Sequence, residues 1–120
     1  MRDALPPGDG AVTWHVDRSA GVVTLAGEID EDNAAMVTDC LVAEISAGAG
    51  RLDLSGVSFI SAAGVRALLT GHGALRPGDP ELRVTCSPIV LRVMVICGLG
   101  ETPRMRLVAA DRAHHPTVAR

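Results

Sequence analysis

Aromatic residues are nearly absent from this chain of 120 residues, which has one Trp, one Phe and no Tyr. Proteins that bind single-stranded nucleic acid usually stack the bases on aromatic side chains. The formal net charge of -3 also lacks the basic excess that neutralises duplex phosphates. Both absences argue against nucleic acid as a partner. They also require a core of aliphatic residues, which suits strands buried on both faces or closely packed helices.

Long apolar runs are missing too. No segment approaches the roughly 20 apolar residues that a transmembrane helix needs. The first ten residues, MRDALPPGDG, have no apolar segment of signal-peptide type. We therefore expect a cytoplasmic protein without membrane insertion. It should consist of a flexible lead at residues 1–10, a single domain at residues 11–110 and a flexible tail at residues 111–120.

Reactive groups are sparse and scattered. Cys40, Cys86 and Cys97 lie far apart in apolar segments and form no C-x-x-C pair, so buried reduced thiols are expected. His114 and His115 are adjacent in the tail, but further metal ligands are missing there. The sequence contains no glycine-rich phosphate loop and no local Ser/His/Asp or Cys/His motif. We expect no metal, no cofactor and no enzymatic activity.

The apolar pattern predicts an α/β fold with a small mixed sheet, its parallel part covered by helices. Period-two alternation predicts strands at residues 11–16 and 22–27, which should be antiparallel because their link is too short for a crossover. A helical stripe at residues 34–45 followed by a strand at residues 51–54 predicts a right-handed parallel unit. Helices are then expected at residues 62–76 and 89–97, and strands at residues 82–86 and 105–109. The helix at 89–97 has one charge, Arg92, and should lie largely buried or at an interface.

The stretch RLDLSGVSFISAAGVRALL, residues 51–69, organises the chain. It predicts a strand, a Ser/Gly turn, a short apolar segment and an amphipathic helix with Val65, Leu68, Leu69 and His72 on one face. A helix start at the end of a strand is a natural presentation site, because its first N–H groups lack intrahelical partners. Gly64 would let another backbone or a partner approach closely.

This stretch resembles the signature of STAS domains, the family of the anti-sigma factor antagonists. The resemblance lies in Asp53-Leu54-Ser55-Gly56, in Ser61-Ala62-Ala63-Gly64-Val65 and in Ala67-Leu68-Leu69. Gly27-Glu28-Ile29-Asp30 is similar to the family's Gly-Glu-Leu-Asp turn before the first helix, and Cys97-Gly98-Leu99 to the end of its last helix. In the family, the run Asp-Ser-Ser-Gly-Leu carries the phosphoacceptor as its first serine. Laid on this sequence, that serine falls on Ala62.

The resemblance implies binding of an anti-sigma factor of serine-kinase type, with an ATPase fold, through the loop and helix at residues 58–70. Alanine cannot accept phosphate, so no phosphorylation switch is expected at Ala62. The implied partner-binding residues are Glu28, Asp30, Ser58, Ser61, Ala62, Ala63, Gly64, Val65 and Arg66.

Three points stay open at this stage. Ser61 or Ser58 could replace the lost acceptor, although a plain N-cap is the favoured interpretation of Ser61. Asp30 or Asp32 could cap the first helix, and Asp30 could equally contact a partner. STAS domains also occur as non-switching subunits of larger transport or signalling assemblies, in which the apolar helix at 89–97 would be a docking face.

Overall fold

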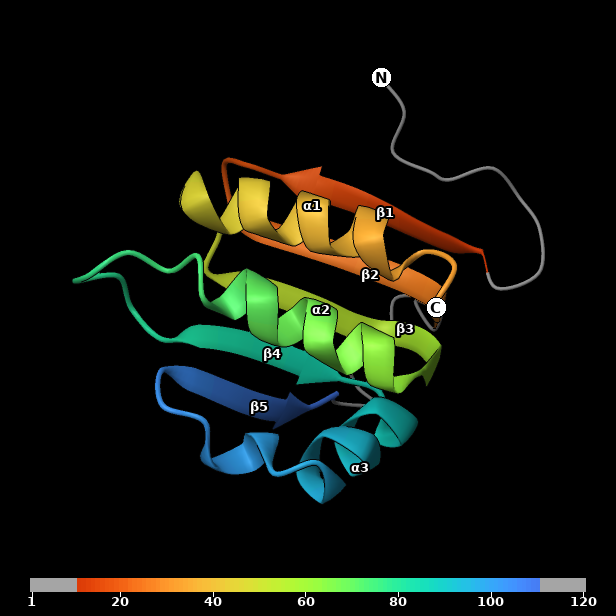
Figure 1. Ribbon diagram of the computed structural model, residues 1–120. Helices are drawn as coiled ribbons and strands as arrows, with labels where there is room; N and C mark the ends of the chain where they lie inside the picture. The colour runs from red at the N-terminus through yellow and green to blue at the C-terminus, as the bar shows by residue number, and fades with distance from the viewer. Residues whose placement is uncertain (1–10, 111–120) are drawn as a thin grey trace, which may run out of the picture.

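The computed structural model describes residues 11–110 as an alternation of strands and helices (Figure 1). The strands are β1 (Val12–Asp17), β2 (Val22–Ile29), β3 (Arg51–Ile60), β4 (Leu82–Cys86) and β5 (Met105–Ala109). The helices are α1 (Ala34–Ser46), α2 (Ala62–His72), α3 (Pro88–Ile96) and the short 3₁₀ helix η1 (Leu99–Glu101). The expected lead and tail, with His114 and His115, lie outside the described residues.

The strands form one mixed sheet in the order β1-β2-β3-β4-β5. β1 pairs with β2 in antiparallel fashion, and all later neighbours are parallel. Each parallel pair is connected through a helix, as a crossover requires. The predicted α/β fold with a small mixed sheet is confirmed.

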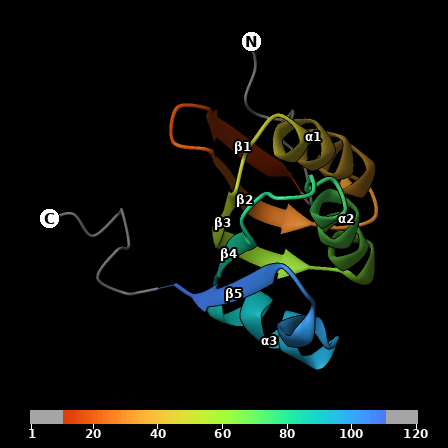
Figure 2. The same ribbon diagram turned by 90° about the vertical axis from the view of Figure 1, so that its left-hand side faces the viewer.

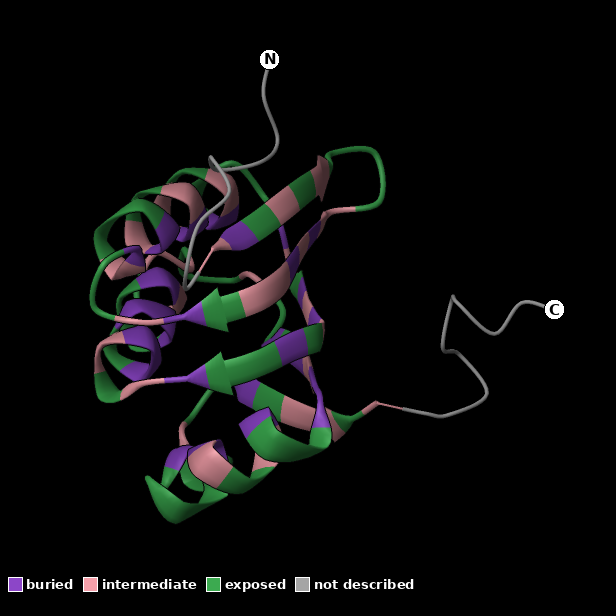
Figure 3. Ribbon diagram, turned by 90° about the vertical axis from the view of Figure 1, so that its right-hand side faces the viewer, coloured by how far each residue is buried: buried purple, intermediate pink, exposed green. Residues whose placement is uncertain are grey.

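The core lies on one side of this sheet. α1 and α2 pack against each other and cover that side together, while α3 packs against β3, β4 and β5 and lies below β5 in the view of Figure 1 (Figures 1 and 2). Alternate side chains along the strands, such as Leu25, Leu54 and Val84, are fully buried there. Among the described residues, the intervening side chains of the other face are exposed or half-buried (Figure 3). The strands are therefore not buried on both faces, and the aliphatic core is one-sided.

β2 and β3 are longer than expected. The expected Ser/Gly turn at residues 55–56 is wrong, because β3 runs without a break to Ile60. β2 likewise continues through the expected Gly27–Asp30 turn as far as Ile29. Register shifts between the two strands accommodate this extra length, as β-bulges do. Gly56 allows a close approach instead of a turn, since a Cβ there would lie 3.1 Å from the Cβ of Ala26.

α2 ends at His72 and not near residue 76. Its buried residues include Gly64, Ala67 and Gly71, whereas Leu69 is 38% exposed, so the expected apolar face was rotated from the true one. The reason is the contact with α1. A Cβ on Gly71 would lie 2.6 Å from the Cβ of Leu41, so small residues bring the two helices together.

α3 is less buried than expected. Val90 and Met94 are buried, but Ile89, Val95 and Ile96 are among the exposed large apolar residues. The cause is that α3 contacts the sheet along one side, while its other side faces outward. The cysteine prediction is right for Cys86, wrong for the exposed Cys97 and half right for the half-buried Cys40. None of the described helices is both long enough and apolar enough to cross a membrane.

Candidate functional site

The loop between β3 and α2 is held by the ends of two neighbouring strands. Glu28 pairs with Phe59 in the register of β2 and β3. The Ser61 amide donates to the Ile29 carbonyl at 2.9 Å, and the Ser58 hydroxyl donates to the Gly27 carbonyl at 3.3 Å. The structure therefore brings residues 27–30 together with residues 58–61, which are about thirty positions apart in the sequence.

Ser61 begins α2 as its N-cap. Its backbone is extended, and its Oγ accepts a hydrogen bond from the Gly64 amide at 3.2 Å. Its carbonyl accepts the first helical bond, from the Val65 amide at 3.0 Å. This geometry confirms the predicted cap. The half-buried Ser61 hydroxyl is therefore engaged in a structural hydrogen bond.

The outward side of α2 starts with Ala62, which is exposed. Arg66 follows one turn later and is exposed as well, as are Leu69 and Thr70 further along. Phe59, at the end of β3, is 47% exposed, but it directly precedes the buried Ile60 and therefore points to the sheet face that α2 does not cover. We call the outward side of α2, made of Ala62, Arg66, Leu69 and Thr70, the α2 surface. It combines small and apolar side chains with a single cation.

Gly64 and Val65 do not belong to the exposed surface. Both are buried. A Cβ on Gly64 would lie 2.7 Å from the Ile60 Cγ1 and 2.9 Å from the Ile29 Cγ2. Gly64 therefore seats the first turn of α2 on the strand ends, and the close approach that it permits is internal. Ala63 is half-buried between these residues and the surface.

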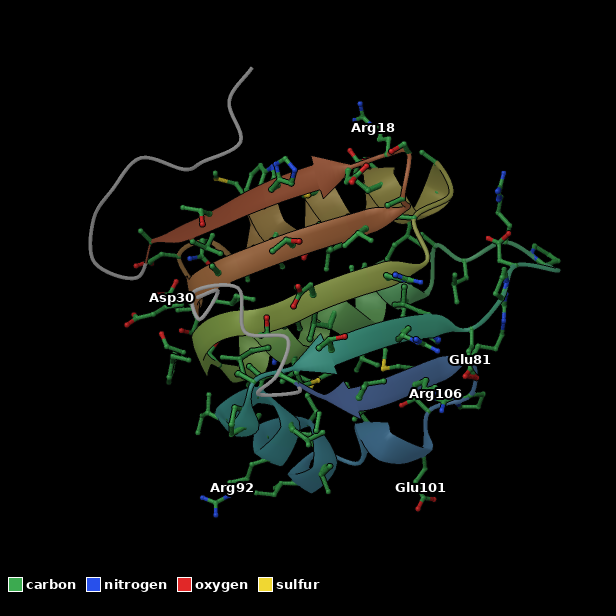
Figure 4. The ribbon with its side chains drawn as sticks, turned by 180° about the vertical axis from the view of Figure 1, so that it is seen from behind. Arg18, Asp30, Glu81, Arg92, Glu101 and Arg106 are labelled. Atoms are coloured by element: carbon green, nitrogen blue, oxygen red, sulfur yellow. The ribbon has the colours of Figure 1, made fainter. Side chains whose placement is uncertain are left out.

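Asp30 shapes the turn before α1, and Figure 4 labels it at the corner where β2 ends. Its Oδ1 accepts from the amides of Asp32 at 3.0 Å and Asn33 at 3.3 Å. Asn33 directly precedes α1, but its side chain makes no cap hydrogen bond. Asp30 makes the bonds of a cap one turn earlier, since its carbonyl also accepts from the Ala34 amide at 2.9 Å. The expectation of an Asp cap is therefore right for Asp30 and wrong for Asp32.

Asn33 is the residue that sequence reasoning missed. It is buried, its Oδ1 accepts from the Asp30 amide at 3.0 Å, and its Nδ2 donates to the Glu28 carbonyl at 2.8 Å. These bonds tie the end of β2 to the start of α1. A signal was present, because a capping residue such as Asp30 is often paired with a polar side chain three residues later that bonds back to its amide.

The residues of this site are suited to contact with a protein more than to metal binding or catalysis. Within residues 11–110 there is no group of three or more His, Cys, Asp or Glu side chains that could hold a metal ion. All buried side-chain nitrogen and oxygen atoms in that range have hydrogen-bond partners. Asp53, near the start of β3, uses its Oδ1 to accept from the amide and hydroxyl of Ser55 at 3.0 and 2.7 Å, which is a structural role.

Known structures share this architecture. An anti-sigma factor antagonist from Mycobacterium paratuberculosis is 25% identical, with a TM-score of 0.71 over 82% of this chain and 88% of that one. The anti-sigma factor antagonist SpoIIAA in its unphosphorylated form is 16% identical, with a TM-score of 0.59 over 90% and 94% of the two chains. Apo-SiaC from Pseudomonas aeruginosa is 13% identical, with a TM-score of 0.60 over 90% and 97%.

No curated protein matches this chain in sequence. The family model described as "Mlab, STAS domain" matches residues 12–109, which is nearly all of the described range and includes both the β3–α2 loop and the turn at Asp30. The chain therefore belongs to the STAS domain family.

Proposed function

We propose that this protein acts as an anti-sigma factor antagonist that binds a kinase-like anti-sigma factor through residues 58–70 and is not switched by phosphorylation at Ala62. The observation that carries the proposal is the exposure of Ala62 on the first turn of α2, directly after the Ser61 cap. The position is presented outward as a phosphoacceptor would be, but its side chain has no hydroxyl.

The α2 surface suits contact with a protein. Ala62 and Ala63 allow a partner backbone to come close, Leu69 supplies apolar area, and Arg66 would be a rim contact of small energy. Glu28, Asp30 and Ser58 flank this surface at the strand ends, while Gly64 and Val65 support it from below. A phosphate at this position would bring a charge of about -1.5 to -2 into a packed interface. With alanine the protein keeps the binding form.

Neither nearby serine replaces the acceptor in this proposal. The Ser61 Oγ is half-buried and accepts the cap bond from Gly64, and the Ser58 Oγ donates to the Gly27 carbonyl. Incubation with ATP and the native serine-kinase anti-sigma factor, followed by mass spectrometry, should find no phosphate on the chain. Phosphate on Ser61 or Ser58 would contradict the absence of a switch.

A capture experiment tests the binding surface. Wild type, Ala62→Glu and Ala43→Glu serve as parallel baits in the native lysate, because Ala43 is an exposed alanine on α1 that adds the same charge away from the proposed surface. An ATPase-fold anti-sigma factor should be captured by wild type and Ala43→Glu and lost from Ala62→Glu. Equal capture by Ala62→Glu would overturn the proposal.

A second candidate is a non-switching STAS subunit of a larger transport or signalling assembly. The exposed apolar residues Ile89, Val95 and Ile96 on α3 favour it, because exposed apolar patches mark interaction sites. In the same lysate, Val95→Ser with Ile96→Ser would then lose a transport or scaffold component that Ala62→Glu retains. Deletion of the gene would disturb transport and leave sigma-factor targets unchanged.

A further inference from the structure

The open face of the sheet carries three adjacent arginines. Residues in register on neighbouring strands point to the same face, with the strands about 4.8 Å apart. One such row crosses the whole sheet near the starts of β2 to β5. In sheet order it consists of Asp17, Val22, Arg51, Arg83 and Arg106. The arginine row, Arg51, Arg83 and Arg106, thus spans about 10 Å across three strands.

Like charges directly opposite each other on neighbouring strands destabilise a sheet, and little on the protein offsets them. Within residues 11–110, the row takes part in one ion pair, between the Arg106 Nη1 and the Glu81 Oε2 at 3.9 Å, and both side chains are largely exposed (Figure 4). Asp53 lies on the same face, but its Oδ1 accepts from Ser55. Arg51 and Arg83 are exposed and have no ion pair in the described part of the chain.

The row is separate from the α2 surface. It lies at the start of β3, whereas Ala62 follows the end of that strand, and it lies on the face that α1 and α2 leave uncovered. A shallow depression of about 410 Å³ adjoins it, lined by Arg51, Arg83, the glycines at 21, 48 and 50, Ala20, Pro80 and Glu81, whose carboxylate pairs with Arg106. A Cβ at Gly48 or Gly50 would meet nothing within 4 Å. There is consequently room beside the guanidinium groups for another molecule.

We infer that the arginine row is a second interaction surface, which binds the acidic face of a helix in a partner protein. Side chains at i and i+4 on a helix lie about 5–6 Å apart, so carboxylates at i, i+4 and i+8 match the spacing of the row. Arginine also binds carboxylates in bidentate geometry. Asp17 and Asp53 share the face. They would repel a uniformly anionic membrane, whereas a protein helix can place neutral or basic residues against them.

A defined peptide tests this inference on the full chain. The probe is a fluorescent alanine-rich helical peptide with glutamates at i, i+4 and i+8, and its control has the same composition with glutamates spread around the helix. We expect wild type to bind the probe about tenfold more tightly than the control in fluorescence anisotropy, and Arg83→Glu to lose about tenfold in affinity. Arg83→Gln should weaken binding less, and circular dichroism would verify that both variants fold.

Arg92→Glu is the matched control, because Arg92 is an exposed arginine on α3 that points away from the sheet in Figure 4. It should bind the probe as wild type does, and so should Ala62→Glu, whatever the outcome for the proposed function. Equal losses in Arg83→Glu and Arg92→Glu would overturn the inference, since binding would then follow net charge. Tighter binding to phosphatidylserine vesicles than to the peptide, or displacement of the peptide by millimolar inorganic phosphate, would overturn the choice of a protein partner.

Discussion

α2 and α3 begin in the same way and end in different surroundings. Each follows a parallel strand and starts with a serine in extended conformation, Ser61 or Ser87. Each serine accepts a hydrogen bond from the amide three residues later, Gly64 at 3.2 Å and Val90 at 3.3 Å. Ser87 also donates to the Val57 carbonyl at 2.7 Å and is buried. The same local signal therefore produces one half-exposed helix start and one that is fixed in the core.

The more apolar of the two helices, α3, is the less buried one. α3 is almost wholly apolar, yet it exposes Val95 and Ile96 at 56% and 76%. α2 contains two glycines, an arginine and a threonine, yet it packs against both α1 and the sheet. A helix is buried by the elements that surround it, and its composition limits how close they come. As a result α2 presents small residues around Ala62, and α3 presents bulky apolar ones.

At the two helix starts, the largest effect is expected where α2 rests on the strand ends. Gly64→Val would place a Cβ 2.7 Å from the Ile60 Cγ1 and 3.2 Å from the Ile29 carbonyl oxygen, and overpacking of this kind lowers the free energy of unfolding by about 3 kcal/mol. Gly100→Ala is the control, because a Cβ there meets nothing within 4 Å. Urea unfolding measures both. A loss below about 1 kcal/mol for Gly64→Val would mean that α2 is not packed this tightly.

The next expected difference is in thiol reactivity, between Cys86 and Cys40, which are buried and half-buried, and the exposed Cys97 after α3. Burial raises the pKa of Cys86 and of Cys40 on α1 to about 11, from an ordinary value of 9.0. At pH 8 both therefore hold about a hundredfold less thiolate than an ordinary cysteine, and their labelling should rise steadily as the pH approaches 11. The exposed Cys97, just after α3, should react first with a disulfide reagent, and Cys97→Ser should remove that fast phase. A single common rate would contradict this difference.

The two capping serines should differ in stability by a smaller amount. Ser61→Ala removes one cap bond and should cost about 1 kcal/mol. Ser87→Ala removes a cap bond and a buried bond to Val57, so about 2 kcal/mol is expected. Chemical unfolding of the two variants side by side measures the difference. Equal losses would mean that the Ser87 bond to Val57 contributes nothing beyond the cap.

The order of the elements could be predicted from the sequence, because each element carries its own period and its own start signal. The Ser61 cap is such a local signal, and it was predicted correctly. The length of β3 was not predictable in this way. Ser55-Gly56 has the composition of a turn, and what keeps it in a strand is the approach of Gly56 to Ala26, a contact between residues far apart in the sequence.

The same distinction between local signals and long-range contacts applies to the candidate site. The exposure of Ala62 and Arg66 follows from their helical spacing, and the motif placed Ala62 at the loop. The burial of Gly64 depends on Ile29 and Ile60, which a helical pattern does not include. The arginine row could not be found either, since Arg51, Arg83 and Arg106 become neighbours through the sheet register alone.

The smallest effect on stability is expected on the outer side of α3. Ile96→Ser alters a side chain that is 76% exposed, so the free energy of unfolding should change by less than about 0.5 kcal/mol. Met94→Ala, two residues earlier and fully buried, should lose about 2–5 kcal/mol. Thermal and urea unfolding would check both. A large loss for Ile96→Ser in the isolated protein would mean that this side of α3 is covered, for example by a second copy of the chain. The free energy of unfolding of the wild type should then fall on dilution. A small loss would show that this side of α3 is open in the isolated protein, which the assembly-subunit function requires and the proposed function permits.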